Sequence, residues 1–143
     1  MIKFNESTCR TGETPSSNFH GSARGIGQLA ACMANGGVWK GKRLLSETAF
    51  DALHSSPIAE HEPIWHNRNL FTQGGLQYFN ESLLTPPVDY FESKFYTNRH
   101  GFYGWFGIGG SVLQWNPELK IGFAYVPSDM SLWDPVNNRG ARL

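Results

Sequence analysis

The sequence predicts an α+β domain in which helices pack on an antiparallel sheet. Three observations support this: a capped amphipathic helix pattern near residues 22–34, a second capped helix near residues 47–54, and a strand–turn–strand pattern in residues 111–126. Apolar residues make up 40% of the 143 residues and charged residues 17%, which is typical of a globular chain of about one domain.

The first helix has a start signal, an apolar face and a stop signal. Ser22 is the expected N-cap, and Asn35-Gly36-Gly37 is typical of a left-handed C-terminal cap. Its apolar face is formed by Ile26, Leu29, Ala30 and Met33. Gly25 and Gly27 each cost about 1 kcal/mol relative to alanine inside a helix. We therefore expect another element to pass close to this helix.

A short extended pair and a second helix follow. Val38-Trp39 and residues 43–45 are expected to be extended on either side of a turn at residues 40–42. Ser46 then caps a helix from Glu47 to about His54. In that helix Phe50 and Leu53 are expected to face inward.

The segments on either side of this region carry fewer signals. Residues 1–20 show no periodicity and are expected to be an irregular lead-in. Residues 55–101 are interrupted by prolines, and only one strand is expected there, within residues 70–79, with Gly74-Gly75 near its start. A loop-rich segment of this length in a compact domain usually forms part of a site.

Residues 102–126 carry the most information. Gly107, Gly109 and Gly110 have no Cβ, so the backbone there can approach a bound molecule closely. Residues 111–115 and 121–126 read as two strands, joined by turn residues 116–120. Residues 127–143 leave room for only a few residues of a terminal helix near Arg139, well short of the roughly 12 that are marginal alone.

Charge and hydropathy exclude several classes. The net charge is zero and the pI is about 7.0, so no basic patch indicates nucleic acid. No apolar run is long enough for a membrane span, and the first ten residues are too polar for a signal peptide, so a cytoplasmic location is the default expectation. Cys9 and Cys32 are not expected to pair, because Cys32 falls in a helical pattern and reads as a small buried residue.

Three stretches carry a family resemblance: residues 18–29 (NFHGSARGIGQL), residues 35–46 (NGGVWKGKRLLS) and residues 107–126 (GIGGSVLQWNPELKIGFAYV). They resemble the C-terminal part of serine β-lactamase-related hydrolases, and are most similar to the class C and penicillin-binding-protein-like branch with its esterases and D-aminopeptidases. The resemblance covers about half the chain. It implies a partial β-lactamase/transpeptidase-like fold and an amide or ester substrate.

The chemistry that this family uses is only partly present. The family's nucleophile and base form a Ser-x-x-Lys pair, and no serine here is followed three residues later by lysine. Tyr78-Phe79-Asn80 and Tyr96-Thr97-Asn98 match the family's Tyr-x-Asn as strings, but they lie after the helix that the motif should precede. We therefore assign no catalytic residue, and we expect neither a cofactor nor a metal.

The third family motif, on the edge strand, has two possible positions. His100-Gly101-Phe102 keeps an imidazole that can donate to a carboxylate, whereas Phe102-Tyr103-Gly104 fits the spacing to Ser111 better but keeps only the glycine. A surface histidine before a strand is an equally good interpretation of His100. The expected substrate-lining residues are His100, Gly101, Trp105, Gly109, Gly110 and Ser111.

The resemblance also implies an organisation for the whole chain. Residues 1–143 are expected to be a C-terminal portion of such a domain, with a lead-in at 1–20, helices and hairpin at 22–54, a loop-rich segment at 55–101, the edge-strand hairpin at 102–126 and a truncated terminal helix at 127–143. Without its remaining strands and helix, such a portion should expose a large apolar patch. We therefore expect it to be unstable alone, to self-associate or to depend on another segment. The alternative is a non-catalytic binding module derived from the same fold.

Other sites receive less support. His54, His61 and His66 lie near Glu60 and Glu62, but His61 and His66 are five residues apart, about 140° around a helix, and Pro63 opposes a helix there. Solvated loop histidines are the default interpretation. Ser111 follows two glycines but lacks the second glycine of a Gly-x-Ser-x-Gly elbow.

Aromatic residues make up 14% of the chain, and most of its tryptophans are expected in the core or in a cleft wall. They are Trp39, Trp65, Trp105, Trp115 and Trp133. Trp105 and Phe106, next to the glycines, are the best candidates for lining a pocket.

Overall fold

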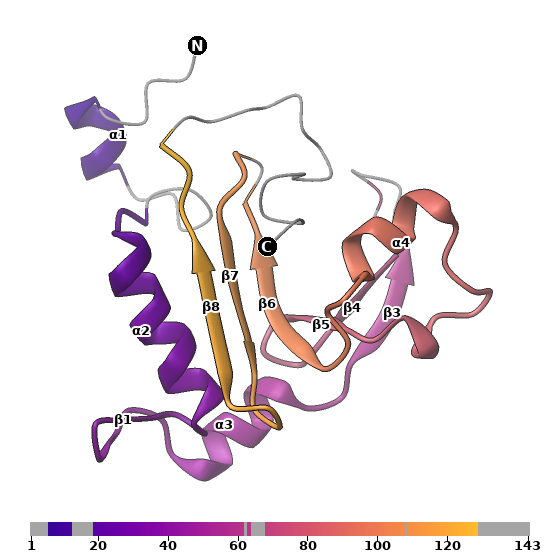
Figure 1. Ribbon diagram of the computed structural model, residues 1–143, viewed down its shortest axis with the longest axis horizontal. Coiled ribbons are helices and arrows are strands. Elements are labelled where there is room, and N and C mark those ends of the chain that lie inside the picture. Colours follow the sequence, from indigo (N-terminus) through magenta and orange to yellow (C-terminus); the bar gives the residue numbers. More distant parts are fainter. Residues whose placement is uncertain (1–5, 13–18, 62, 64–67, 108, 129–143) are drawn as a thin grey trace.

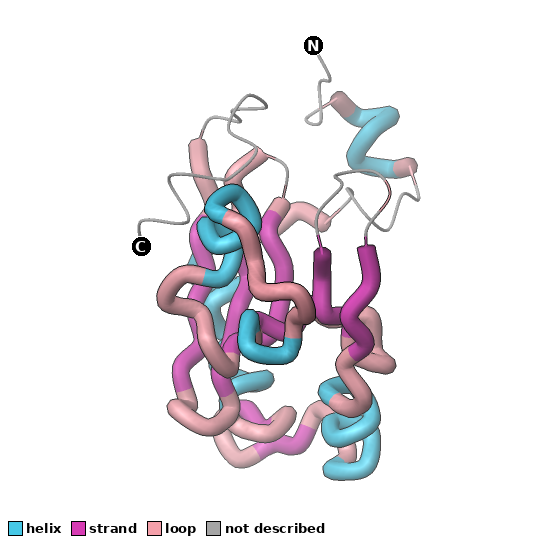
Figure 2. The backbone as a smooth tube through the Cα atoms, turned by 90° about the vertical axis from the view of Figure 1, so that its right-hand side faces the viewer, coloured by secondary structure: helices cyan, strands magenta, loops and turns pink. Residues whose placement is uncertain are grey.

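The computed structural model describes residues 6–12, 19–61, 63, 68–107 and 109–128, and its centre is a six-stranded antiparallel sheet with strand order β3-β4-β5-β6-β7-β8 (Figure 1). The elements are α1 (Ser7–Thr11), α2 (Ala23–Ala34), β1 (Val38–Trp39), β2 (Lys42–Arg43), α3 (Glu47–His54), β3 (Ile58–His61), β4 (Arg68–Phe71), β5 (Gln77–Phe79), the 3₁₀ turn η1 (Glu81–Leu83), α4 (Tyr90–Tyr96), β6 (Phe102–Phe106), β7 (Val112–Asn116) and β8 (Ile121–Tyr125). Their path along the backbone can be followed in Figure 2.

The helix caps predicted in residues 22–54 are confirmed, but Leu29, which was expected on the apolar face of the first helix, is 43% exposed, whereas Ala30 and Met33 are buried. The Ser22 hydroxyl accepts a hydrogen bond from the Gly25 amide at 3.2 Å, and the Ser46 hydroxyl accepts one from the Ala49 amide at 3.1 Å. Gly36 and Gly37 adopt positive φ after α2, as a left-handed cap requires. The expected extended pair is present as the antiparallel β1–β2 ribbon, but its second strand is Lys42–Arg43 and not residues 43–45, because Lys42 pairs with Trp39 instead of belonging to the turn.

Helix α2 lies on the face of β8 and β7, and the closest approach falls on a strand glycine. A Cβ built on Gly122 would lie 2.4 Å from the Ala31 nitrogen and 2.5 Å from the Ala30 carbonyl carbon. Close packing was expected from Gly25 and Gly27, but a Cβ on Gly27 would be 3.9 Å from the Ala124 Cβ, an ordinary contact. The helix backbone therefore packs against a strand without a side chain at that point.

Each face of the sheet has its own core. Met33, Ala34 and Trp115 form one cluster, against which α3 packs with Phe50 and Leu53. On the opposite face the other cluster consists of Leu70, Phe79, Leu84 and Tyr96. Side chains alternate along a strand, so adjacent residues of β6 serve different clusters: Tyr103 belongs with the first and Phe102 with the second.

Residues 55–101 contain more regular structure than expected. The single strand expected in residues 70–79 is wrong: β4 and β5 are two strands, and Gly75 has φ 74° in the turn between them. Helix α4 was missed, although Asp89 and Glu92 form a capping box at its start. The short helix α1 likewise lies inside the expected irregular lead-in.

An ion pair connects α4 to the sheet. The Glu92 carboxylate accepts hydrogen bonds from the Arg68 side chain and from the Arg68 amide, the latter at 3.0 Å. The same guanidinium also donates to the carbonyl groups of Pro86 and Pro87. The hydrogen bond from the Arg68 side chain, with those from the Arg68 and Asp89 amides, holds the pKa of Glu92 down to about 2.

Two further expectations concern cysteine and the C-terminus. Cys9 and Cys32 are both free thiols, and Cys32 is buried as expected. The terminal helix expected near Arg139, like Trp65 and Trp133, lies outside the described residues.

Candidate functional site

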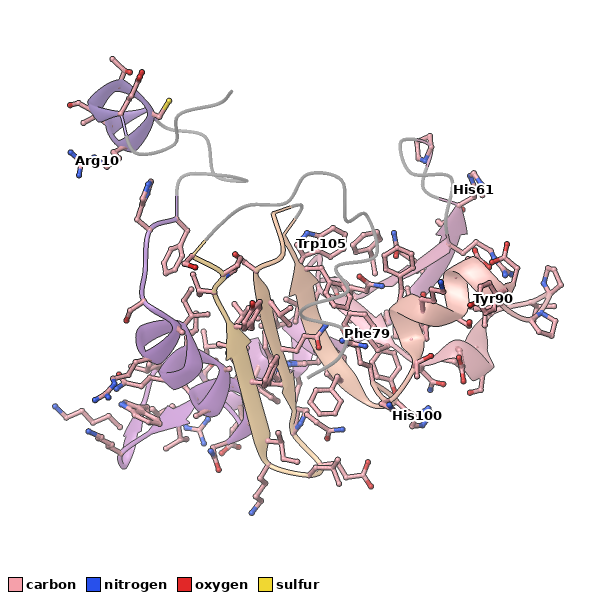
Figure 3. The ribbon with its side chains drawn as sticks, turned by 45° about the horizontal axis from the view of Figure 1, so that its top comes forward. Arg10, His61, Phe79, Tyr90, His100 and Trp105 are labelled. Atoms are coloured by element: carbon pink, nitrogen blue, oxygen red, sulfur yellow. The ribbon has the colours of Figure 1, made fainter. Side chains whose placement is uncertain are left out.

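The predicted substrate-lining residues fall at two ends of β6. His100 and Gly101 precede the strand, whereas Trp105 lies near its other end and Gly109–Ser111 lie in the connection to β7. Residues 101 and 107 are separated by about 20 Å at the usual rise of a strand. His100 and Trp105 accordingly lie far apart in Figure 3. The structure brings Trp105 close to the glycine loop and does not bring His100 there.

Gly101 directly precedes β6 and joins it to the end of β5. It has φ 80°, and its amide donates to the Phe79 carbonyl at 2.9 Å. A Cβ there would lie 2.9 Å from the Asn116 Nδ2 atom, and that amide donates to the His100 carbonyl at 3.4 Å. The His100 side chain is exposed. These contacts involve the backbone of His100 and Gly101, so they stabilise the sheet end.

The glycine loop between β6 and β7 is a tight turn held by its own backbone. The Gly107 amide donates to the Ser111 carbonyl at 2.7 Å, and the Gly110 amide donates to the Gly107 carbonyl at 2.9 Å. Gly110 has φ 100°, a conformation that strongly favours glycine. The loop therefore presents backbone and the half-buried Ser111 beside Trp105.

Four aromatic side chains lie on the neighbouring strands β4, β5 and β6, and we call them the aromatic wall: Phe71, Tyr78, Tyr103 and Trp105, of which Trp105 lies nearest the glycine loop. The rings of Phe71 and Trp105 are 5.7 Å apart, and those of Tyr78 and Tyr103 are stacked at 4.6 Å. Tyr103 and Trp105 point to the same face of β6 because side chains alternate, and this is the face on which α2 and α3 pack. Phe106, which was expected to line a pocket with Trp105, points to the other face, where its ring contacts Phe79 at 5.4 Å.

His54, at the end of α3, packs against the aromatic wall at Tyr103. Its Nδ1 atom lies 2.7 Å from the Phe50 carbonyl, and its Nε2 accepts a hydrogen bond from the Trp115 indole at 2.9 Å. Both contacts fit the neutral ring that is protonated on Nδ1. Burial lowers the pKa of His54, and the imidazole packs against the edge of Tyr103 at 4.6 Å. The residue is therefore a neutral packing element of this site.

The two Tyr-x-Asn strings differ in their environments. The Tyr96 hydroxyl donates to the Arg68 carbonyl at 2.9 Å, and burial raises the pKa of Tyr96 to about 12, so this phenol cannot act as a base near neutral pH. Tyr78 is half-buried in the aromatic wall, and its hydroxyl accepts a hydrogen bond from the Asn80 amide at 3.3 Å. Of the two strings, only Tyr78-Phe79-Asn80 is next to the candidate site.

Sequence reasoning found Trp105 and the glycine loop and missed the other members of the wall. Phe71 and Tyr78 come from the loop-rich segment, and His54 from the end of a helix. Alternating aromatics at residues 103 and 105 were a usable signal, since i and i+2 share one face of a strand. No group of histidine, cysteine, aspartate or glutamate side chains that could hold a metal is found among the described residues; His66 and Glu62 lie outside them.

Comparisons with known proteins identify the fold. No protein-family model matches the sequence, and no curated protein matches it. A solved structure of a family VIII carboxylesterase superposes with a TM-score of 0.61 at 22% identity, over 85% of this chain and 30% of that chain. A penicillin-binding protein homologue from Caulobacter crescentus superposes with a TM-score of 0.63 at 16% identity, over 94% of this chain and 37% of that chain.

The fold is that of the β-lactamase-related serine hydrolases. The expected α+β class and the resemblance to the penicillin-binding-protein-like branch are thus confirmed at the level of fold. This chain spans about a third of the length of either solved structure. In the described part of the chain, no helix has the length and apolar character needed to cross a bilayer.

Proposed function

We propose that this chain forms one wall of a β-lactamase-related serine hydrolase site that acts on an amide or ester bond. The observation that supports this most directly is the glycine loop beside Trp105, on the helix-covered face of a sheet with the fold of such enzymes. Backbone amides at a glycine turn can receive a carbonyl oxygen as it gains charge, and because the Gly107 and Gly110 amides already donate within this turn, the proposal assigns that role to the amides of Gly109 and Ser111. In this proposal Gly109, Gly110 and Ser111 line the substrate and do not attack it.

We further propose that the chain is inactive by itself. No serine in the sequence is followed three residues later by lysine, so the pair that would form the acyl-enzyme is missing. Among the described residues, no hydrogen bond joins the Ser111 hydroxyl to a histidine or lysine, and the Ser111 carbonyl accepts a hydrogen bond from the Gly107 amide at 2.7 Å. The reacting groups would have to come from a segment outside these 143 residues.

An acylation experiment tests both parts. The purified chain is incubated with a fluorophosphonate probe and with a fluorescent penicillin, and no serine should be labelled. A longer product of the same gene is then treated in the same way, and labelling is expected at a Ser-x-x-Lys serine that precedes residue 1. Specific labelling of a serine in the short chain would contradict the proposal that it is inactive alone. A longer product without such a serine would favour the alternative, a binding module derived from the same fold.

The chain is also proposed to self-associate through exposed apolar surface. Among the described strands, β8 pairs with β7 on one side only, and its five residues carry no charge. Ile121 on β8 and Leu29 on the adjoining helix are 47% and 43% exposed. An uncharged edge strand offers unpaired backbone groups to another chain. Because the net charge is zero, copies of the chain do not repel one another strongly.

A further inference from the structure

The aromatic wall is built as a surface of rings with fixed positions. Tyr78 and Tyr103 occupy directly paired positions of β5 and β6, and Trp105 is paired with Leu113 of β7. Each of the three therefore sits on a strand that is hydrogen-bonded to a neighbour, which limits its backbone freedom. Phe71 ends β4, and its ring lies 5.7 Å from that of Trp105 at an interplanar angle of 31°. Little conformational entropy would be lost when a ligand stacks on such a surface.

Exposure singles out Trp105 as the contact residue. Its side chain is 47% exposed, whereas Phe71, Tyr78 and Tyr103 are half-buried. The chain next to it continues into the glycine loop, where Gly107, Gly109 and Gly110 carry no side chain that could cover the indole. An exposed tryptophan fixed on a paired strand leaves one large apolar ring accessible to a small molecule.

The wall favours an uncharged ligand. None of its four residues carries a formal charge, and burial, together with the neighbouring Tyr78, raises the pKa of Tyr103. Beneath it, His54 is also neutral, because its Nε2 accepts a hydrogen bond from Trp115. An ionic group stacked here would lose hydration without gaining a partner of opposite charge among these residues.

We infer that the aromatic wall binds a flat, uncharged aryl group of the substrate, with Trp105 as the principal contact, while the adjacent glycine loop lies at the scissile ester or amide. The placement of the glycine loop at the scissile bond rests on the proposed function, whereas the binding of an aryl group by the wall does not. It assigns to the wall the selection of aryl or benzyl esters and amides over aliphatic ones. Aromatic rings prefer offset-stacked or edge-to-face contacts at 4.5–7 Å between centroids, the range in which the wall's own rings already lie.

A binding experiment on the chain itself tests the inference without requiring turnover. N-benzylacetamide, N-(cyclohexylmethyl)acetamide and N-butylacetamide are titrated separately, and binding is followed by ligand-observed NMR. The benzyl compound is expected to bind more tightly than the other two. Trp105→Ala should weaken its binding about three- to tenfold, the range expected for the loss of one aromatic pair.

Tyr90→Ala is the matched control. Tyr90 is 80% exposed on α4, which packs on the opposite face of the sheet, so its loss should leave binding unchanged (Figure 3). Trp105→Leu keeps an apolar side chain and should reproduce the loss of preference for the benzyl compound; it also serves if the alanine variant does not fold.

Two outcomes would overturn the inference: equal binding of all three amides, or unchanged binding of the benzyl compound in both Trp105 variants. The acylation experiment on the longer product tests the proposed function independently of this binding experiment. A labelled serine there, together with no benzyl preference here, would refute the wall's role and leave the hydrolase proposal standing.

Discussion

The contact between α2 and β8 makes a quantitative prediction for Gly122→Ala. The new Cβ would lie 2.4 Å from the Ala31 nitrogen, and contacts under 3.0 Å essentially do not occur, with 3.4 Å the lower limit of ordinary contact. The helix would therefore have to retreat by about 1 Å from the strand, since backbone atoms cannot rotate out of the way. That shift separates Met33 and Ala34 from Trp115, with which they form a buried cluster.

The expected cost follows from these distances. Overpacking of a well-packed interface typically destabilises by about 1–3 kcal/mol, and domains of this size are stable by only about 5–15 kcal/mol. Each kcal/mol lowers the melting temperature of such a chain by roughly 3–5 °C, so a fall of about 3–15 °C is expected. Thermal unfolding followed by circular dichroism, with urea unfolding at 25 °C, measures it.

A second glycine at the same interface provides the control. A Cβ on Gly27 would meet the Ala124 Cβ at 3.9 Å, an ordinary contact, and alanine is favoured over glycine inside a helix by about 1 kcal/mol. Gly27→Ala should therefore leave the melting temperature unchanged or raise it. If Gly122→Ala unfolded at the same temperature as the unmodified chain, the close approach of α2 to β8 would be refuted, whatever the control showed.

Three further predictions concern charge and assembly. Because Arg68 holds the pKa of Glu92 at about 2 against an ordinary value of 4.5, the pair's stabilisation is present above pH 4.5 and is lost as pH falls toward 2; unfolding free energies across this window should lose about 3 kcal/mol, and Glu92→Gln should remove most of that slope. Burial lowers the pKa of His54 below its ordinary 6.5, so the unfolded chain binds the proton more readily and stability should decline as pH drops below 6.5; a His54→Phe chain with the same decline would exclude this residue as the cause. Light scattering after size exclusion should show the unmodified chain as larger than a monomer and Ile121→Lys shifted toward the monomer, and a monomeric unmodified chain would contradict self-association.

The parts of the fold that could be predicted are those whose causes are local. The helix starts at Ser22 and Ser46 are determined by a hydroxyl and an amide three residues later, and the β7–β8 hairpin by turn residues between two β-forming runs. Each of these signals lies within a few residues of the structure that it specifies. The glycine loop beside Trp105 was predicted for the same reason.

The missed parts depend on distant partners. Helix α4 has a capping box, but its position is fixed by Arg68, which lies 24 residues before Glu92. Strand β5 is only three residues long and is recognisable mainly through its pairing with β6. The aromatic wall also depends on distant partners, because strand pairing brings together residues 71, 78, 103 and 105. From the sequence, residues 71 and 78 appear only as parts of a loop-rich segment.

The glycines show most clearly why a correct physical rule can be applied at the wrong residue. Two glycines inside a helix indicated that something approaches α2 closely, and something does. The atoms that approach are the helix backbone at Ala30 and Ala31, and the residue that must lack a side chain is Gly122 on the strand. A helix glycine allows a neighbour to approach only where its Cβ would point at that neighbour, and the sequence does not reveal that direction. Gly122 lies in the run 121–126 that was predicted as a strand. To locate the close contact at Gly122, one would also need to know which residues of α2 lie opposite it, and neither segment carries that information alone.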